Sequence, residues 1–327
     1  MKHLAMDLEE ALDAAAPDAG EETGRILSRR NAPKQLLVPP TARGLIRMTL
    51  EEWLQIGLLW AACLLAPIWM YPIWALLLAG RFHALGVILH DATHMPLRGK
   101  PLSLRFVEVL CGYPIASTLN AMRYHHLRHH RETGMATDPY HKPGQKNFSW
   151  WATNLSRGLV LVPFWSVRGY VGAVTFLIPA LHPLYARIFL QDRSGECVKN
   201  YVEIRDCARA EWGQILFQAV VLPLAFLYPL PFILGYAIPV TVAGILAAHR
   251  VIIEHNHQAT LDRRLETIMH CTYDNFLGVW GKLGLAPRNI GYHIVHHIHP
   301  QVGLHALPLL REWYLERYPN EYPGPRI

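Results

Sequence analysis

Four long apolar runs, arranged as two pairs, dominate the pattern of hydrophobic and polar positions along this chain. They cover residues 53–69 and 73–89, then 212–228 and 231–253. A helix needs about 20 residues to cross the hydrocarbon core of a bilayer, so each run is long enough together with its flanks. Proline-containing turns at 67–72 and 228–232 join the members of each pair. The pattern predicts an all-α integral membrane protein with four transmembrane helices in two hairpins.

Histidines gather in three clusters beside these runs, and His255 stands apart directly after the last run. The clusters are His90 and His94; His125, His126, His129 and His130; and His293, His296 and His297. On a helix, positions i, i+3 and i+4 share one face, and imidazole is a good ligand for iron, zinc, copper and nickel. A lone histidine is usually a hydrogen-bonded core residue, but many buried together would leave polar groups unsatisfied. So many imidazoles exceed what one ion can use, and they predict two metal ions side by side.

Lysine and arginine placement predicts the orientation in the membrane. The two tight turns contain no lysine or arginine, whereas the N-terminal flank and the middle segment, 91–210, contain many. By the positive-inside rule both termini, the middle segment and all three histidine clusters are cytoplasmic. Apolar stretches at 106–119 and 159–190 are therefore expected to be interfacial helices that lie in the membrane surface or dip into it, because an odd number of spans would separate the clusters.

Composition agrees with one membrane-embedded unit. Only 17% of the 327 residues are charged, against about 25% in a usual soluble domain. The net charge of +6 fits a cytoplasmic face lying against anionic lipid, and no nucleic-acid motif appears, so we expect no nucleic acid partner. We expect an N-terminal tail and interfacial segment at 1–49, a catalytic membrane domain at 50–312 and a C-terminal tail at 313–327.

With these clusters in view, the chain resembles the membrane fatty acid desaturase and hydroxylase family, whose enzymes are histidine-box di-iron proteins. The pattern His-x3-His, then His-x2-His-His, then a C-terminal His-x2-His-His is that family's signature. The trailing Asp138-Pro139 and the isolated Glu254-His255 also match. The sequence departs from the acyl-CoA enzymes at Val251, where they carry an Asn ligand, and it has no His-Pro-Gly-Gly motif of a fused cytochrome b5 domain.

Resemblance and spacing together assign the metal ligands. They are His90, His94, His126, His129, His130, His255, His293, His296 and His297. Neutral imidazole ligands need their second ring nitrogen held by an acceptor. Candidates for that role, or for alternative ligands, are His125, His257, Asp91, Glu132, Asp138, Glu254 and Asn289.

Attack on an unactivated C–H bond needs an oxidant that no side chain supplies, so a metal has to carry the chemistry. The resemblance implies two iron ions (Fe2+/Fe3+) in a cytoplasmic histidine-rich cap, with O2 as co-substrate and a fatty acyl or related lipid chain as substrate. No flavin, heme or iron–sulfur motif is evident. An external electron donor of the ferredoxin, rubredoxin or cytochrome b5 type is therefore expected to dock on the basic cytoplasmic face.

The histidine boxes do not separate the reactions that begin with the same hydrogen abstraction. Desaturation is favoured, and the alternatives are a hydroxylase, a ketolase or a decarboxylating enzyme that forms a terminal alkene. From another class, a zinc-dependent membrane lipid hydrolase stays open, although zinc catalytic sites use three protein ligands and a water. A metal transporter is a third option, but transporters bind near the bilayer midplane rather than at its edge.

Overall fold

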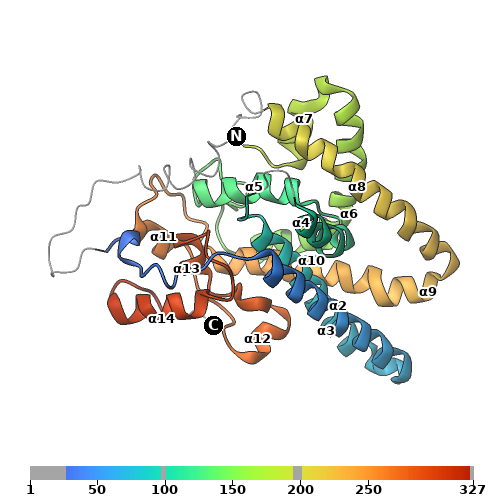
Figure 1. Ribbon diagram of the computed structural model, residues 1–327, viewed down its shortest axis with the longest axis horizontal. Helices are drawn as coiled ribbons and strands as arrows, with labels where there is room; N and C mark the ends of the chain where they lie inside the picture. Colours follow the sequence, from blue (N-terminus) through green and yellow to red (C-terminus); the bar gives the residue numbers. More distant parts are fainter. Residues whose placement is uncertain (1–26, 97–100, 194–200, 325–327) are drawn as a thin grey trace.

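The described part of the chain is all-helical, and its long helices extend to one side of a cap of short helices (Figure 1). The computed structural model describes residues 27–96, 101–193 and 201–324. Most of the predicted N-terminal tail and the last residues of the predicted C-terminal tail lie outside these ranges. Within them, the only β pairing is an isolated bridge between His255 and Thr272.

Five helices in the described ranges are long and apolar enough to cross a membrane. They are α2 (Ala42–Leu65), α3 (Tyr71–Ala92) with the turn before it from Ile68, α6 (Phe148–Leu177), α8 (Tyr201–Leu227) and the segment Pro229–Glu254, which ends in α10 (Ile238–Glu254). A sixth candidate is a bent pair, Leu102–Ile115 and Leu119–Glu132, with 83° between its halves. The predicted four-span topology is therefore not confirmed, because the stretch expected to lie in the interface around 159–190 contains most of α6.

The remaining elements are short. They are the α-helices α4 (Leu102–Val107), α5 (Leu119–Glu132), α7 (His182–Phe189), α9 (Pro229–Phe232), α11 (Leu265–Cys271), α12 (Val279–Gly284), α13 (His293–Ile298) and α14 (Leu307–Arg317), the π-helical turns Glu108–Gly112 and Ile233–Ala237, and the 3-10 turns Arg29–Asn31, Ile68–Met70, Tyr113–Ile115, Pro179–Leu181 and Pro287–Asn289.

Local sequence explains where the important helices begin. Thr118 caps α5, because its side chain accepts a hydrogen bond from the backbone N–H of Ala121. Asn147 caps α6 in the same way through the N–H of Trp150. Asp274 accepts the N–H of Ile294 at the start of α13, and it also binds Arg311 and the hydroxyl of Tyr322. The start of the third histidine cluster is thereby tied to α14 and to the segment that follows it.

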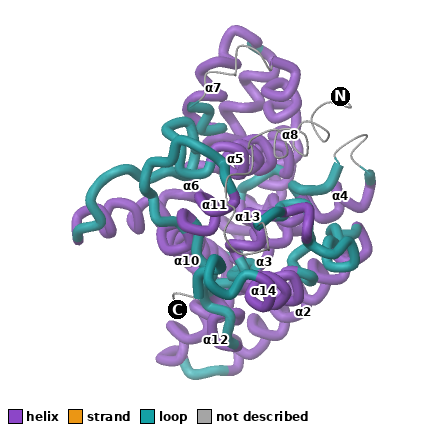
Figure 2. The backbone as a smooth tube through the Cα atoms, turned by 90° about the vertical axis from the view of Figure 1, so that its left-hand side faces the viewer, coloured by secondary structure: helices purple, strands orange, loops and turns teal. Residues whose placement is uncertain are grey.

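Three apolar clusters hold these elements together. One joins α2, α3, α4 and α10, a second joins α11, α13 and α14, and a third joins α5, α7 and α8. Between α6 and α8 lies a fully buried ion pair, in which Arg168 Nε lies 2.8 Å from Glu211 Oε1. The hydroxyl of Tyr185 donates to the same carboxylate oxygen. In Figure 2, α5, α11, α13 and α14 lie near the middle of the view.

Candidate metal centre

Four separate segments bring nine histidines into one buried region. The end of α3 carries His90, and His94 follows in the next turn; α5 carries His126, His129 and His130; α13 carries His293, His296 and His297; and His255 directly follows α10. Spacings of three and four residues put the histidines of α5 on one helix face, and likewise those of α13. The helices converge at their histidine-bearing ends.

These nine are the residues predicted as ligands, and they form two groups. The first group is His90, His94, His126, His130 and His296, and the second is His129, His255, His293 and His297. Within each group the candidate ligand atoms all lie within 4.8 Å of one another. The groups adjoin, since the ring centroids of His130 and His297 are 4.4 Å apart. The number of sites thus matches the two-ion expectation.

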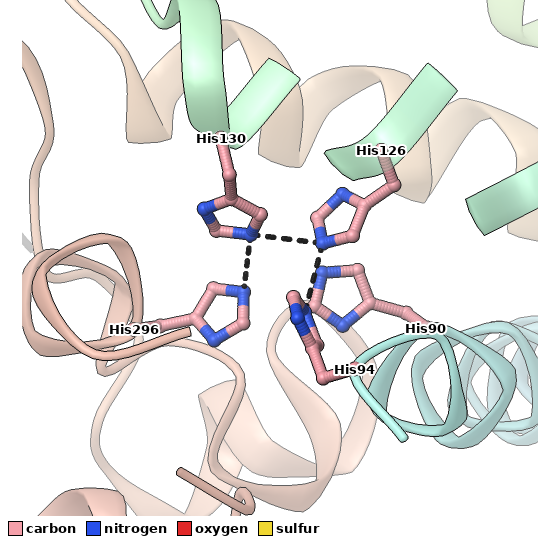
Figure 3. A group of neighbouring side chains, drawn as sticks. All are labelled: His90, His94, His126, His130 and His296. Atoms are coloured by element: carbon pink, nitrogen blue, oxygen red, sulfur yellow. Dashed lines mark hydrogen bonds between the residues drawn. The ribbon is translucent and has the colours of Figure 1, made fainter. Parts of the chain in front are cut away.

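In the first group, ring nitrogens face one another across a small space (Figure 3). His126 Nε2 lies 3.1 Å from His94 Nε2 and 2.9 Å from His130 Nε2, which in turn lies 3.0 Å from His296 Nε2. A neutral imidazole carries one N–H, so each such pair needs one donor and one acceptor. A single cation that accepts all the lone pairs satisfies these nitrogens at once, and the donor set therefore fits a metal ion.

The second group fits a metal for an additional reason: each Nδ1 faces an acceptor. The Nδ1–H of His129 donates to Asp138 at 2.8 Å and that of His255 to the carbonyl of Val251 at 3.1 Å. His297 Nδ1 lies 3.2 Å from the hydroxyl of Thr133. His293 Nδ1 lies 3.4 Å from Glu254 Oε2, within ion-pair reach but not aligned as a hydrogen bond. Protons held on Nδ1 leave the Nε2 lone pairs free for a metal.

Asp138 is the best supported of the predicted acceptors. Its carboxylate also accepts the backbone N–H groups of Gly134 and Tyr140. Burial raises the pKa of Asp138, but His129 and the two N–H groups outweigh burial and lower that pKa to about 2. The carboxylate is therefore charged at neutral pH and oriented before any ligand binds.

Other predicted acceptors lie elsewhere. Among the described residues, no hydrogen bond joins Asp91, Glu132 or Asn289 to a histidine: Glu132 pairs with Arg131 and Asn289 binds the carbonyl of Leu304. His125 and His257 belong to neither group. His125 Nδ1 lies 2.7 Å from the Tyr140 hydroxyl, and His257 Nδ1 accepts the backbone N–H of Lys142.

Sequence reasoning missed two side chains at the site, Thr133 and Tyr140. Thr133 follows His129 by four residues, so helical spacing was the available signal for it. Tyr140 packs against the ring of His129, with 4.3 Å between centroids, and buries its hydroxyl against His125. Its position depends on the fold of the loop after α5, and no local pattern marks it.

An apolar cavity of about 200 Å3 opens beside the histidines. His90, His126, His129, His255 and His293 form one part of its wall, and helices α3, α6 and α10 form much of the rest. The apolar lining includes Phe82, Val87, Leu161, Val162 and Val240. An alkyl chain lying in this cavity would pass the histidine groups with little water around it.

Comparison with known proteins agrees with this geometry. No curated protein matches the chain. The family model described as Fatty acid desaturase matches residues 49–326, which covers most of the chain and includes all nine histidines. The two histidine groups suited to metal ions and the long apolar helices of an integral membrane protein agree with this match. The chain therefore belongs to the fatty acid desaturase family of enzymes.

Proposed function

We propose that this enzyme is an O2-dependent di-iron oxidoreductase that desaturates a fatty acyl or related lipid chain. The observation that supports this most is the shared cavity, where two groups of imidazoles and an apolar wall meet. Two adjacent iron ions, held by the nine histidines, would supply with O2 the oxidising power that no side chain has. The mostly apolar lining would position the chain and exclude water from it.

The protein's own residues contribute orientation. Asp138, Thr133 and the carbonyl of Val251 hold three of the rings of the second group, so those rings need little rearrangement to bind a metal. Tyr140 fills the space between His125 and His129. Hydroxylation, ketolation and decarboxylation to a terminal alkene begin with the same abstraction of hydrogen, and they are the alternative outcomes at this site.

Product analysis tests the reaction. After expression in a host of known lipid content, mass spectrometry of the extracted chains should show the loss of two hydrogens. A gain of one oxygen would indicate hydroxylation instead of desaturation, and a chain shortened by one carbon would indicate decarboxylation. Purified protein should hold about two irons per chain and require O2 and a reductant. One zinc per chain with anaerobic activity would favour the lipid hydrolase instead.

The proposed topology keeps both termini and the active site on the cytoplasmic side. Contacts of α6 support it. At its start, Trp150 packs against His257, just after α10, with 5.6 Å between the rings. Beyond its end, the carbonyl of Pro179 accepts the hydroxyl of Tyr201, the first residue of α8. The start of α6 therefore lies near the C-terminal end of α10, and the segment after α6 lies near the N-terminal end of α8. In the proposed topology both of these ends of the α8–α10 hairpin are on the cytoplasmic side.

An external electron donor would approach this same side. The proposal also includes the division of the chain into a membrane domain at 50–312 with a tail on either side of it.

A further inference from the structure

The apolar cavity beside the histidines adjoins a second, polar cavity whose wall carries three cations. Lys142, Asn154 and Arg157 line both cavities, and Arg193 lines the polar one. Arg157 and Arg193 are exposed, whereas Lys142 is half-buried. One end of an alkyl chain lying in the apolar cavity would therefore reach these cations.

The hydrogen bonds that the two arginines of this group form all go to uncharged groups. The Arg157 guanidinium donates to the side-chain oxygen of Asn154, and Arg193 donates to the backbone carbonyls of Asp138 and His141. No described carboxylate forms an ion pair with any of the three cations. Burial, followed by the nearby charges of Arg157 and Arg193, lowers the pKa of Lys142 to about 8, although the nearby charge of Asp138 opposes this shift. Cations held together in this way favour an anion between them.

The backbone around Lys142 is fixed close to the histidine groups. The N–H of Lys142 donates to His257 Nδ1 at 3.3 Å, and the ring of His257 lies 5.8 Å from that of His255. His257 has a φ of 56°, a left-handed conformation that is uncommon outside glycine. His257 is thus a positioning residue for the loop that carries Lys142.

The apolar part of the cavity extends the other way. Val240 also lines the cavity and precedes His255 by 15 residues along α10. At 1.5 Å per residue, the cavity wall along this helix is about 22 Å long. Phe82, eight positions before His90 on α3, lines the same deep part. The cations and the two histidine groups therefore share one end of the cavity, and the other end is mostly apolar, with His83 as a polar lining residue.

We propose that the substrate carries an anionic head group, a carboxylate or a phosphate, which binds among Lys142, Arg157 and Arg193 while its chain lies in the apolar cavity. This rests on the proposed function, because it describes the substrate of the same site. A consequence is that the oxidised carbon lies in the half of the chain next to the head group.

Binding tests the proposal without turnover. Three probes share one chain length: palmitate, hexadecyl phosphate and hexadecanol, each titrated into the purified enzyme in lipid nanodiscs. We expect at least one of the anions to bind about tenfold more tightly than hexadecanol. Lys142→Gln should weaken the preferred anion about tenfold and leave hexadecanol unchanged. The preference between palmitate and hexadecyl phosphate identifies the head group.

Lys34→Gln is the matched control, since Lys34 is exposed and lines neither cavity; it should alter none of the three affinities. Arg157→Gln, a change at an exposed side chain, gives a second reading if Lys142→Gln does not fold. Equal affinity for hexadecanol and both anions, or an equal loss for all three probes in Lys142→Gln, would overturn the proposal.

Turnover with the preferred anion tests the consequence. Mass spectrometry of the product should place the change in the half of the chain next to the head group, and a change in the methyl half would overturn this placement. The two proposals fail separately. Absence of O2-dependent oxidation of every chain, neutral or anionic, refutes the proposed function, while intact head-group discrimination in binding supports the anion site.

Discussion

Replacing Asp138 with asparagine should weaken metal binding without unfolding the protein. Asp138 accepts from His129 at 2.8 Å and from the N–H groups of Gly134 and Tyr140. Asparagine has nearly the same shape, so its side-chain oxygen can keep a hydrogen bond to the loop. Asparagine has no charge, however, and its amide has one acceptor oxygen where the carboxylate has two. It therefore cannot accept hydrogen bonds from the His129 N–H and from both backbone N–H groups in the way that the carboxylate does.

The magnitude follows from the type of bond lost. A hydrogen bond to a charged group contributes about 1.5–3 kcal/mol. At about 1.4 kcal/mol per factor of ten, that corresponds to roughly a 10- to 150-fold loss of metal affinity. The range agrees with the 10- to 100-fold typical of removing a partner that orients a metal-bound histidine.

Metal content measured by mass spectrometry across a series of chelator concentrations is the direct assay, with thermal unfolding in detergent as the check on folding. The matched control is Asp262→Asn. Asp262 is exposed, accepts from Arg264 N and the Thr267 hydroxyl, and belongs to neither histidine group. Asp138→Asn protein that retains metal and turnover as well as Asp262→Asn would refute the orienting role of this carboxylate.

Three further outcomes are expected. His255→Ala should abolish turnover and lower the metal content of the folded protein, whereas His257→Ala should keep the metal; the reverse result would exchange their roles. Arg168→Met should destabilise the protein by about 3–5 kcal/mol, because it leaves the Glu211 charge buried and unpaired, and adding Glu211→Met should recover most of that loss in a thermal unfolding assay. An epitope tag at 229–230 should be accessible from outside the cell, while tags at either terminus and within 140–150 should be cytoplasmic; an external signal from 140–150 would contradict the topology.

The histidine groups follow closely from the sequence because their spacing is a local property of helices. His126, His129 and His130 lie on one face of α5 whatever the rest of the chain does. The convergence of the three clusters depends on the whole fold, because α5 and α13 lie outside the four apolar runs. The metal-binding role of these residues stays a prediction until metal is measured.

The acceptors could not be predicted equally well, since they lie in loops whose path is a property of the whole fold. Asp138 reaches His129 because the chain reverses after α5 at Gly134, which has a φ of 77°. Asp91 and Asn289 are as close to histidines in sequence, yet bind none of them in the described structure. The length of α6 was also missed, because Pro163 and Arg168 interrupt its apolar pattern while the structure accommodates both within one helix.

The two histidine groups take their members from different parts of the sequence, and this has a consequence for biosynthesis. His90, His94, His126 and His130 of the first group are synthesised early, and only His296 comes late. In the second group only His129 is early, and His255, His293 and His297 follow near the end. The helix that carries the last of these is anchored through Asp274 to Tyr322, which is synthesised later still. A growing chain can thus assemble most of the first group while the second has a single member, so metal loading is expected to proceed in that order and to finish only after Tyr322 has been synthesised.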